Sequence, residues 1–534
     1  MKKKWILFLS LVCMVNQPGF TKTKGTINKT GSKLKAATVP NFDLPLNDND
    51  YYEKFIKEIK KSPRSTAAAE TDVPAIENNF EKDFLAIRDE LIGNNLKGEK
   101  NKKGITTVNQ LDQVIEKYSN PDVYKNLSNQ SKFVALQLRS LKPFKSFIFR
   151  AKGYIGNISA TRTLIVTMLR NQIAGIQSLF PVAGNASVNH WELVFDYVTT
   201  ATPKMGPEIL TDQDLYVFFT QLTAEYANVV NDFKDIVTTN YKPIWWDNKL
   251  YMSFASFTSE KDRYILLGKP ELYSIYSTTL FNLSTLLSTT AYSFDGLQSS
   301  IKSIGQLFGV DKLISTALNG PEGMSSYTRV KVLKSHPNLF VLTPQGKERM
   351  ERSYDYLKSS VRAARVAYEE TKKLPEGSQN LFDPRVVGAF SRVGNLSFSN
   401  VDQLVSDELP VSSAVLNGER VKVSLKNFYY NPPEKLSDLY PTDWDLSWKL
   451  KDVDVPGYKH KKQRNYKYGM ATEWRLDSYQ NLFPELKGHV SNKRKKTRYD
   501  KEMMVTNDLP KYARILSQTW GASAFAVPLS AVIF

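Results

Sequence analysis

The feature that most restricts the fold is an apolar pattern with helical spacing in the middle of the chain. Between residues 215 and 237 the apolar side chains fall on one face of a helix. They are Leu215, Phe218, Phe219, Leu222, Tyr226, Val229, Val230, Phe233 and Val237. Thr211 and Asp214 precede this stripe with the spacing of a helix cap. The pattern predicts a long amphipathic helix that buries one face against other elements.

Two more segments show a helical period. Residues 160–180 have a similar spacing, and a further stripe is formed by Met350, Tyr354, Leu357, Val361, Ala364 and Tyr368. In front of that stripe, Thr343 is the expected N-cap residue and Pro344 the expected first helical residue. Repeated helices of this kind predict a multi-helix body.

The segment Leu272–Phe294 carries no charged residue, so a membrane-spanning helix has to be considered. Its many serines and threonines argue against this reading, because each polar group costs desolvation free energy in lipid. We expect a core helix instead, with these side chains inward: Leu272, Tyr276, Leu280, Leu283, Leu287 and Phe294. A membrane-inserting hairpin of a surface-active effector is the alternative, although strict alternation is absent.

The character of the sequence changes near residue 376. Asn417-Gly418 stands between two apolar flanks, and Val421, Val423 and Leu425 alternate with polar residues. This pattern predicts a short β-hairpin. The predicted fold class is therefore mainly α, with a helical domain at residues 49–375 and a smaller, mixed or irregular C-terminal region at 376–534.

The N-terminus has the pattern of a secretory signal peptide. Met1–Lys4 is cationic, and Trp5–Val15 is an uncharged apolar run that is too short for a comfortable bilayer span. We predict a signal peptide at residues 1–21 and a basic flexible linker at 22–48. An uncleaved anchor is the main alternative. The one cysteine, Cys13, has a poor lipidation context, so lipidation is a lesser alternative.

The net charge of +18 is concentrated in two places. Residues 1–35 contain eight lysines and no acid, and residues 449–501 contain fifteen basic against six acidic residues. The rest of the chain is close to neutral. Within the basic segment 458–501 we single out the cations Lys459, Lys461, Lys462, Arg464, Lys467, Lys493, Arg494, Lys495, Lys496 and Arg498, and the aromatic residues Tyr466, Tyr468 and Trp474. Such a surface attracts anions while its rings stack on sugars or bases.

Together these features predict an exported protein of the periplasm or cell envelope, or a secreted one, with a binding or scaffolding role. The expected partner is an anionic envelope glycan, a lipid headgroup or an acidic protein. Nucleic acid is disfavoured because export separates the protein from it. We expect no transmembrane span in the mature chain.

Motifs that would define an enzyme are missing from the sequence. The four histidines form no metal-binding pair at helical spacing, and phosphate-loop and nucleophile-elbow patterns are absent. We therefore expect no metal and no cofactor. The alternative enzyme is a hydrolase of envelope polymers that uses acids between Asp438 and Asp454, such as Asp443 and Asp445 beside Trp444.

Overall fold

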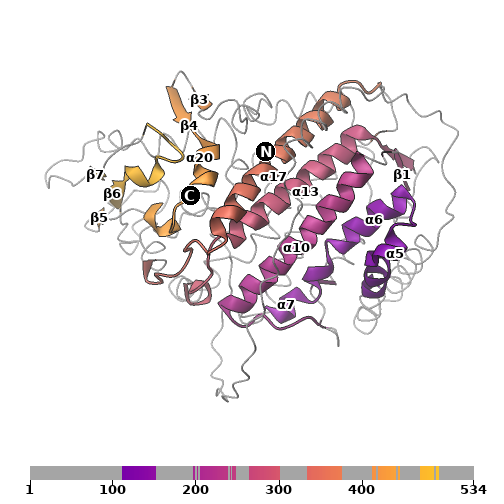
Figure 1. Ribbon diagram of the computed structural model, residues 1–534, viewed down its shortest axis with the longest axis horizontal. Helices are drawn as coiled ribbons and strands as arrows, with labels where there is room; N and C mark the ends of the chain where they lie inside the picture. The colour runs from indigo at the N-terminus through magenta and orange to yellow at the C-terminus, as the bar shows by residue number, and fades with distance from the viewer. Residues whose placement is uncertain are drawn as a thin grey trace, which may run out of the picture. The chain divides into compact units, whose positions relative to one another are not determined.

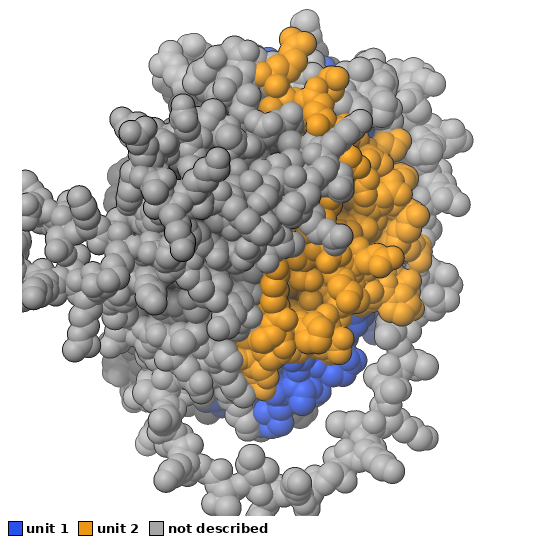
Figure 2. Space-filling model, turned by 90° about the vertical axis from the view of Figure 1, so that its left-hand side faces the viewer, with its two compact units in different colours: residues 1–10, 22–286, 355–394 blue, residues 11–21, 287–354, 395–534 orange. Residues whose placement is uncertain are grey.

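The computed structural model describes residues 111–151, 197–198, 201, 205–238, 241, 243–247, 264–300, 334–375, 380, 412–416, 419–439, 443–445, 470–485 and 489–491. These residues fall into two compact units, which Figure 2 colours separately. Unit 1 comprises the described residues within Lys22–Leu286 and Asp355–Gly394. Unit 2 comprises the described residues within Leu287–Tyr354 and Asn395–Phe534. The predicted signal peptide, linker and helix at 160–180 lie outside the described residues.

Helices dominate the described residues, which confirms the mainly α prediction. Unit 1 contains α5 (Pro121–Tyr124), α6 (Asn129–Arg139), the 3₁₀ helix η2 (Lys142–Phe144), α7 (Phe147–Arg150), α10 (Asp212–Val237), β1 (Ile244–Asp247), β2 (Tyr264–Leu267) and most of α13 (Lys269–Thr290). The long helix α17 (Gly346–Thr371) begins in unit 2 and ends in unit 1. Unit 2 contains β3 (Ser412–Leu416), β4 (Glu419–Val423), α20 (Leu425–Tyr430), η4 (Leu436–Leu439), β5 (Asp443–Asp445), β6 (Met470–Arg475), η5 (Leu476–Tyr479) and β7 (His489–Ser491).

Helix α10 is the amphipathic helix that the apolar stripe predicted. All nine residues of that stripe are buried. The Asp214 backbone N–H donates to Thr211 Oγ1 over 3.1 Å, and the Thr211 N–H donates to Asp214 Oδ2 over 2.9 Å. This reciprocal capping box satisfies two backbone donors at the helix start, so the predicted cap is confirmed.

The core of unit 1 forms where α6, α10 and α13 lie side by side (Figure 1). Phe233 of α10 is fully buried, with its ring centroid 5.7 Å from that of Phe133 on α6 and 5.7 Å from that of Tyr276 on α13. A second aromatic cluster joins Phe144 and Phe147 to Phe218. These contacts connect helices that are far apart in the sequence.

Most of the uncharged segment lies in α13, which ends at Thr290, so Phe294 follows the helix; all six predicted inward residues are buried. Its serines meet partners inside the protein: Ser277 Oγ donates to the Ser360 carbonyl, and Ser360 Oγ donates to the Ser277 carbonyl, each over 2.7 Å. This reciprocal pair joins α13 to the part of α17 in unit 1. Within the described ranges, no helix has the length and apolarity needed to cross a bilayer.

Helix α17 begins later than predicted, and Thr343 is not its N-cap. The Thr343 backbone N–H and Oγ1 instead donate to the Ala291 carbonyl over 2.9 and 3.1 Å. The helix starts at Gly346, where a Cβ atom would lie 2.4 Å from the Ala291 carbonyl oxygen. The Thr343 side chain, which the local sequence predicted as the cap of this helix, therefore bonds to a distant carbonyl instead.

Strands β3 and β4 form the predicted hairpin. Leu416 pairs with Glu419, so only Asn417 and Gly418 separate the two strands, as the sequence indicated. The hairpin is joined to a later part of unit 2, because the Ser424 N–H donates to the Leu482 carbonyl over 2.8 Å. Unit 1 holds a two-stranded antiparallel sheet, β1–β2, which the sequence did not indicate.

Candidate functional site

A three-stranded antiparallel sheet in unit 2, in the order β5–β6–β7, contains the described part of the predicted basic segment. Asp443 of β5 pairs with Glu473 of β6, which in turn pairs with Ser491 of β7. Arg475 pairs with His489. Because positions two apart along a strand share a face, these five positions lie on one face of the sheet.

The pair of positions on the other face of β6 and β7 carries apolar residues. Trp474 of β6 pairs with Val490 of β7, between the rows that hold Glu473 and Arg475. Elsewhere on β6 the alternation of polar and apolar positions is incomplete, because Ala471 shares the face of Glu473 and Thr472 shares the face of Trp474. Trp474 is thus a member of the apolar row, whereas the sequence analysis grouped it with the stacking aromatic residues of the basic segment.

The antiparallel direction of β6 and β7 determines at which end of the sheet each half of the basic segment joins a strand. The cations at 459–467 come just before Met470, where β6 begins, and those at 493–498 come just after Ser491, where β7 ends. Because the strands are antiparallel, the start of β6 and the end of β7 are at the same end of the sheet. The strand ends to which the two cation clusters are joined in the chain therefore lie at one end of the sheet.

Twelve of the thirteen predicted site residues lie outside the described residues. They are Lys459, Lys461, Lys462, Arg464, Tyr466, Lys467, Tyr468, Lys493, Arg494, Lys495, Lys496 and Arg498. Trp474 is the one that the structure places.

The acids of the alternative hydrolase lie on β5, where Asp443 faces Glu473 across the ladder and Asp445 faces Met470. The register shifts between Asp443 and Trp444, at a β-bulge or similar irregularity. Sequence reasoning did not select Glu473, because nothing local connects it to a residue thirty positions earlier. Within the described part of the chain, no group of three or more histidine, cysteine or acidic side chains is arranged to hold a metal ion.

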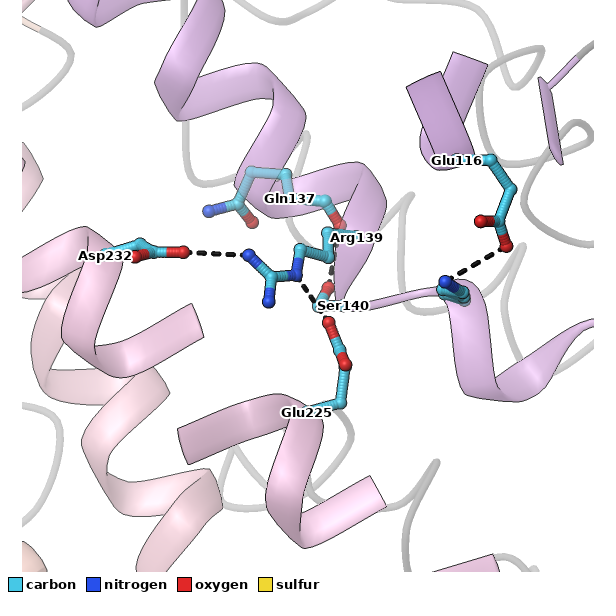
Figure 3. A network of polar contacts seen from close by, with 7 residues as sticks. Glu116, Gln137, Arg139, Ser140, Glu225 and Asp232 are labelled. Carbon is cyan, nitrogen blue, oxygen red and sulfur yellow. Dashed lines mark hydrogen bonds and ion pairs between the residues drawn. The ribbon is translucent and has the colours of Figure 1, made fainter. Parts of the chain in front are cut away.

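A second cluster of ionisable groups lies in unit 1, where Arg139 ends α6 (Figure 3). Its Nε donates to Glu225 Oε1 over 2.5 Å, and its Nη1 donates to Asp232 Oδ2 over 2.8 Å. Glu225 and Asp232 are two turns apart on α10, so one guanidinium spans both. The cluster fastens the end of α6 to the side of α10.

Burial shapes the electrostatics of this cluster. Burial raises the pKa of Asp232 above its ordinary value, and the Arg139 guanidinium opposes that rise. Burial also raises the pKa of Tyr124, with the Asp232 charge acting in the same direction. The Tyr124 hydroxyl is buried and has no hydrogen-bond partner among the described residues. We interpret the cluster as a polar joint between two helices.

Comparisons with known proteins identify no relative. No protein-family model matches the chain, no curated protein matches it, and no solved structure matches it.

Proposed function

We propose that the chain is an exported binding or scaffolding protein of the cell envelope that contacts an anionic partner through the basic segment 458–501. The observation that supports this proposal is the shared end of β6 and β7, to which both basic clusters are tethered. Positive charges gathered at one place attract a polyanion more strongly than the same charges spread over the surface.

Chain length sets how far the cations can be from the sheet. Lys467 is three residues before Met470 and Lys493 is two residues after Ser491. At about 3.6 Å per extended residue, the chain allows a separation from the strand ends of at most about 11 Å for Lys467 and about 7 Å for Lys493.

The expected partner is an anionic glycan, a lipid headgroup or an acidic protein. The aromatic residues Tyr466 and Tyr468 stand among the cations, and such rings stack on sugar faces as well as on bases. Export from the cytoplasm, which the N-terminal pattern predicts, disfavours nucleic acid.

Salt-dependent retention tests this proposal. The wild type is applied to a heparin resin and, separately, to vesicles of phosphatidylglycerol, and eluted with increasing salt. A variant with glutamine at Lys493, Arg494, Lys495, Lys496 and Arg498 should elute at lower salt, because fewer counterions are released on binding. The two probes separate a glycan preference from a headgroup preference.

A matched control removes five exposed lysines from the described helical part of the chain. Glutamine replaces Lys117, Lys125, Lys347, Lys372 and Lys373. If this variant and the cluster variant elute at the same salt concentration, net charge alone explains retention and the basic segment is not the binding surface.

A hydrolase of envelope polymers is the second candidate. The observation that favours it is the cross-strand pair of Asp443 and Glu473, since two carboxyl groups on neighbouring strands can supply the acid and the base or nucleophile of glycoside hydrolysis.

A further inference from the structure

Unit 1 contains a buried arginine that no acidic side chain among the described residues neutralises. Arg150 is the last residue of α7, and only 5% of its surface is exposed. Burying a guanidinium without a counter-charge costs several kcal/mol, on the order of the penalty for any unpaired buried ion. Its surroundings should therefore show what compensates the charge.

Backbone carbonyls accept most of its donors. Arg150 Nε donates to the Pro207 carbonyl over 2.9 Å, and Nη1 donates to the carbonyls of Pro143 and Lys145 over 2.8 and 3.5 Å. The Phe218 ring centroid lies 5.5 Å from Cζ. The remaining nitrogen, Nη2, makes no hydrogen bond within the described residues.

The backbone at Gly206 also packs closely against the Arg150 guanidinium. A Cβ atom at Gly206 would lie 2.8 Å from Arg150 Cζ, so a larger residue there would displace the side chain. On the chain before α7, Ser146 has a left-handed φ of 52°, which is uncommon for a residue other than glycine. The Arg150 N–H donates to the Ser146 carbonyl over 3.0 Å. A sparsely populated backbone conformation thus helps to hold Arg150 in place.

Two acids of this part of unit 1, Asp112 and Glu116, already have partners, and Glu116 lies 3.0 Å from Lys142 Nζ. Asp112 Oδ2 accepts from Lys145 Nζ over 2.5 Å, and Asp112 Oδ1 accepts from the Tyr197 hydroxyl over 3.0 Å. Burial lowers the pKa of Arg150, and among the described residues it is Tyr197, not a carboxylate, that acts against that shift. Lys145 and Asp112 neutralise each other, so the charge of Arg150 remains in excess.

The three carbonyls alone do not require a charged side chain, because a neutral amide also donates to carbonyls and avoids the cost of a buried charge. We propose that the free Nη2 edge of Arg150 binds a small oxyanion, either a phosphate or a carboxylate. Guanidinium groups match both anions in charge and hydrogen-bond geometry. The small exposed fraction of Arg150 restricts the ligand to a compact anion. This site is separate from the basic segment and does not rest on the proposed function.

Equilibrium dialysis with radiolabelled phosphate, and separately with radiolabelled acetate, tests the proposal. The protein used is the full chain with glutamine at Lys493, Arg494, Lys495, Lys496 and Arg498, so that the basic segment does not dominate binding. We expect saturable binding of about one anion per chain, weakened at least tenfold by Arg150→Gln. The matched control Arg365→Gln, at an exposed position of α17, should bind as the parent does. The absence of saturable binding of both anions would overturn the proposal.

Thermal unfolding gives a second measurement that does not depend on isolating a folded Arg150→Gln protein. Phosphate or acetate is compared with sodium chloride at equal ionic strength, using the same parent protein. A bound anion raises Tm with its concentration, since it binds only the native state. A Tm that follows ionic strength alone, or anion binding that persists in folded Arg150→Gln, contradicts the site.

Discussion

Replacing Arg139 with methionine is expected to destabilise unit 1 through the polar joint between α6 and α10. The substitution keeps an unbranched side chain but removes both charged hydrogen bonds and leaves the two acids on α10 without their shared cation. Removing one partner of a buried ion pair costs about 3–5 kcal/mol. Here the Glu225 and Asp232 side chains are 23% and 36% exposed, so solvent takes over part of the lost interaction. We therefore expect a loss of about 2–3 kcal/mol in the free energy of unfolding.

The magnitude can be checked by urea unfolding followed by circular dichroism, with an unchanged m-value showing that the same surface is exposed. The matched control is Arg352→Met. Arg352 Nη2 lies 2.5 Å from Glu348 Oε1, one turn away on α17, and the Glu348 side chain is 60% exposed. The Arg352 side chain is itself 23% exposed, but an i,i+4 pair on one helix whose acid is exposed to solvent is worth about 0.3–0.5 kcal/mol. Equal losses for the two variants would refute the reasoning from burial.

The loss at Arg139 should also depend on pH. The pKa of Asp232 is higher in the native state than in the unfolded state, so the native state keeps this proton to higher pH. The free energy of unfolding therefore falls as the pH rises from the unfolded pKa to the native pKa. Arg139 lowers this pKa, and Arg139→Met would therefore raise it further. The difference between wild type and variant should be larger at pH 7 than at pH 4. A difference that is constant with pH would show that the lost interaction is not with ionised carboxylates.

Two further predictions address other parts of the chain. Gly346→Ala should lower the free energy of unfolding by about 1–3 kcal/mol through overpacking, because its Cβ would lie 2.4 Å from the Ala291 carbonyl oxygen; unchanged urea unfolding would contradict that close approach. If the chain is a hydrolase, it should release reducing ends from heparin, and Asp443→Asn and Glu473→Gln should each abolish the release while Asp438→Asn on η4 does not. Intact heparin after incubation with wild type would remove this candidate for the polymer tested.

The sequence was most informative where local patterns and tertiary packing agree. The stripe from Leu215 to Val237 needs only one apolar face, and any core that accepts this face gives the same helix. Thr211 and Asp214 cap each other within one turn, and no distant partner among the described residues competes for these two groups. Asn417-Gly418 predicts the hairpin for the same local reason.

Features that depend on distant partners could not be predicted. Thr343 meets the Ala291 carbonyl, 52 residues away, and so does not cap α17. Arg139 meets Glu225 and Asp232, 86 and 93 residues further along the chain, and no periodicity indicates such pairs. For the candidate site, the basic clusters were evident from composition, but their tethering to one sheet end required the pairing of β6 with β7.

The antiparallel pairing of β6 and β7 has a consequence for the sheet itself. Ten cations stand in the chain just before β6 and just after β7, and like charges that lie near one another repel until counterions or an opposite charge screen them. This repulsion acts to pull the strand ends apart in dilute salt. If the proposed polyanion binds these cations, it would relieve the repulsion and so stabilise the pairing of β6 with β7.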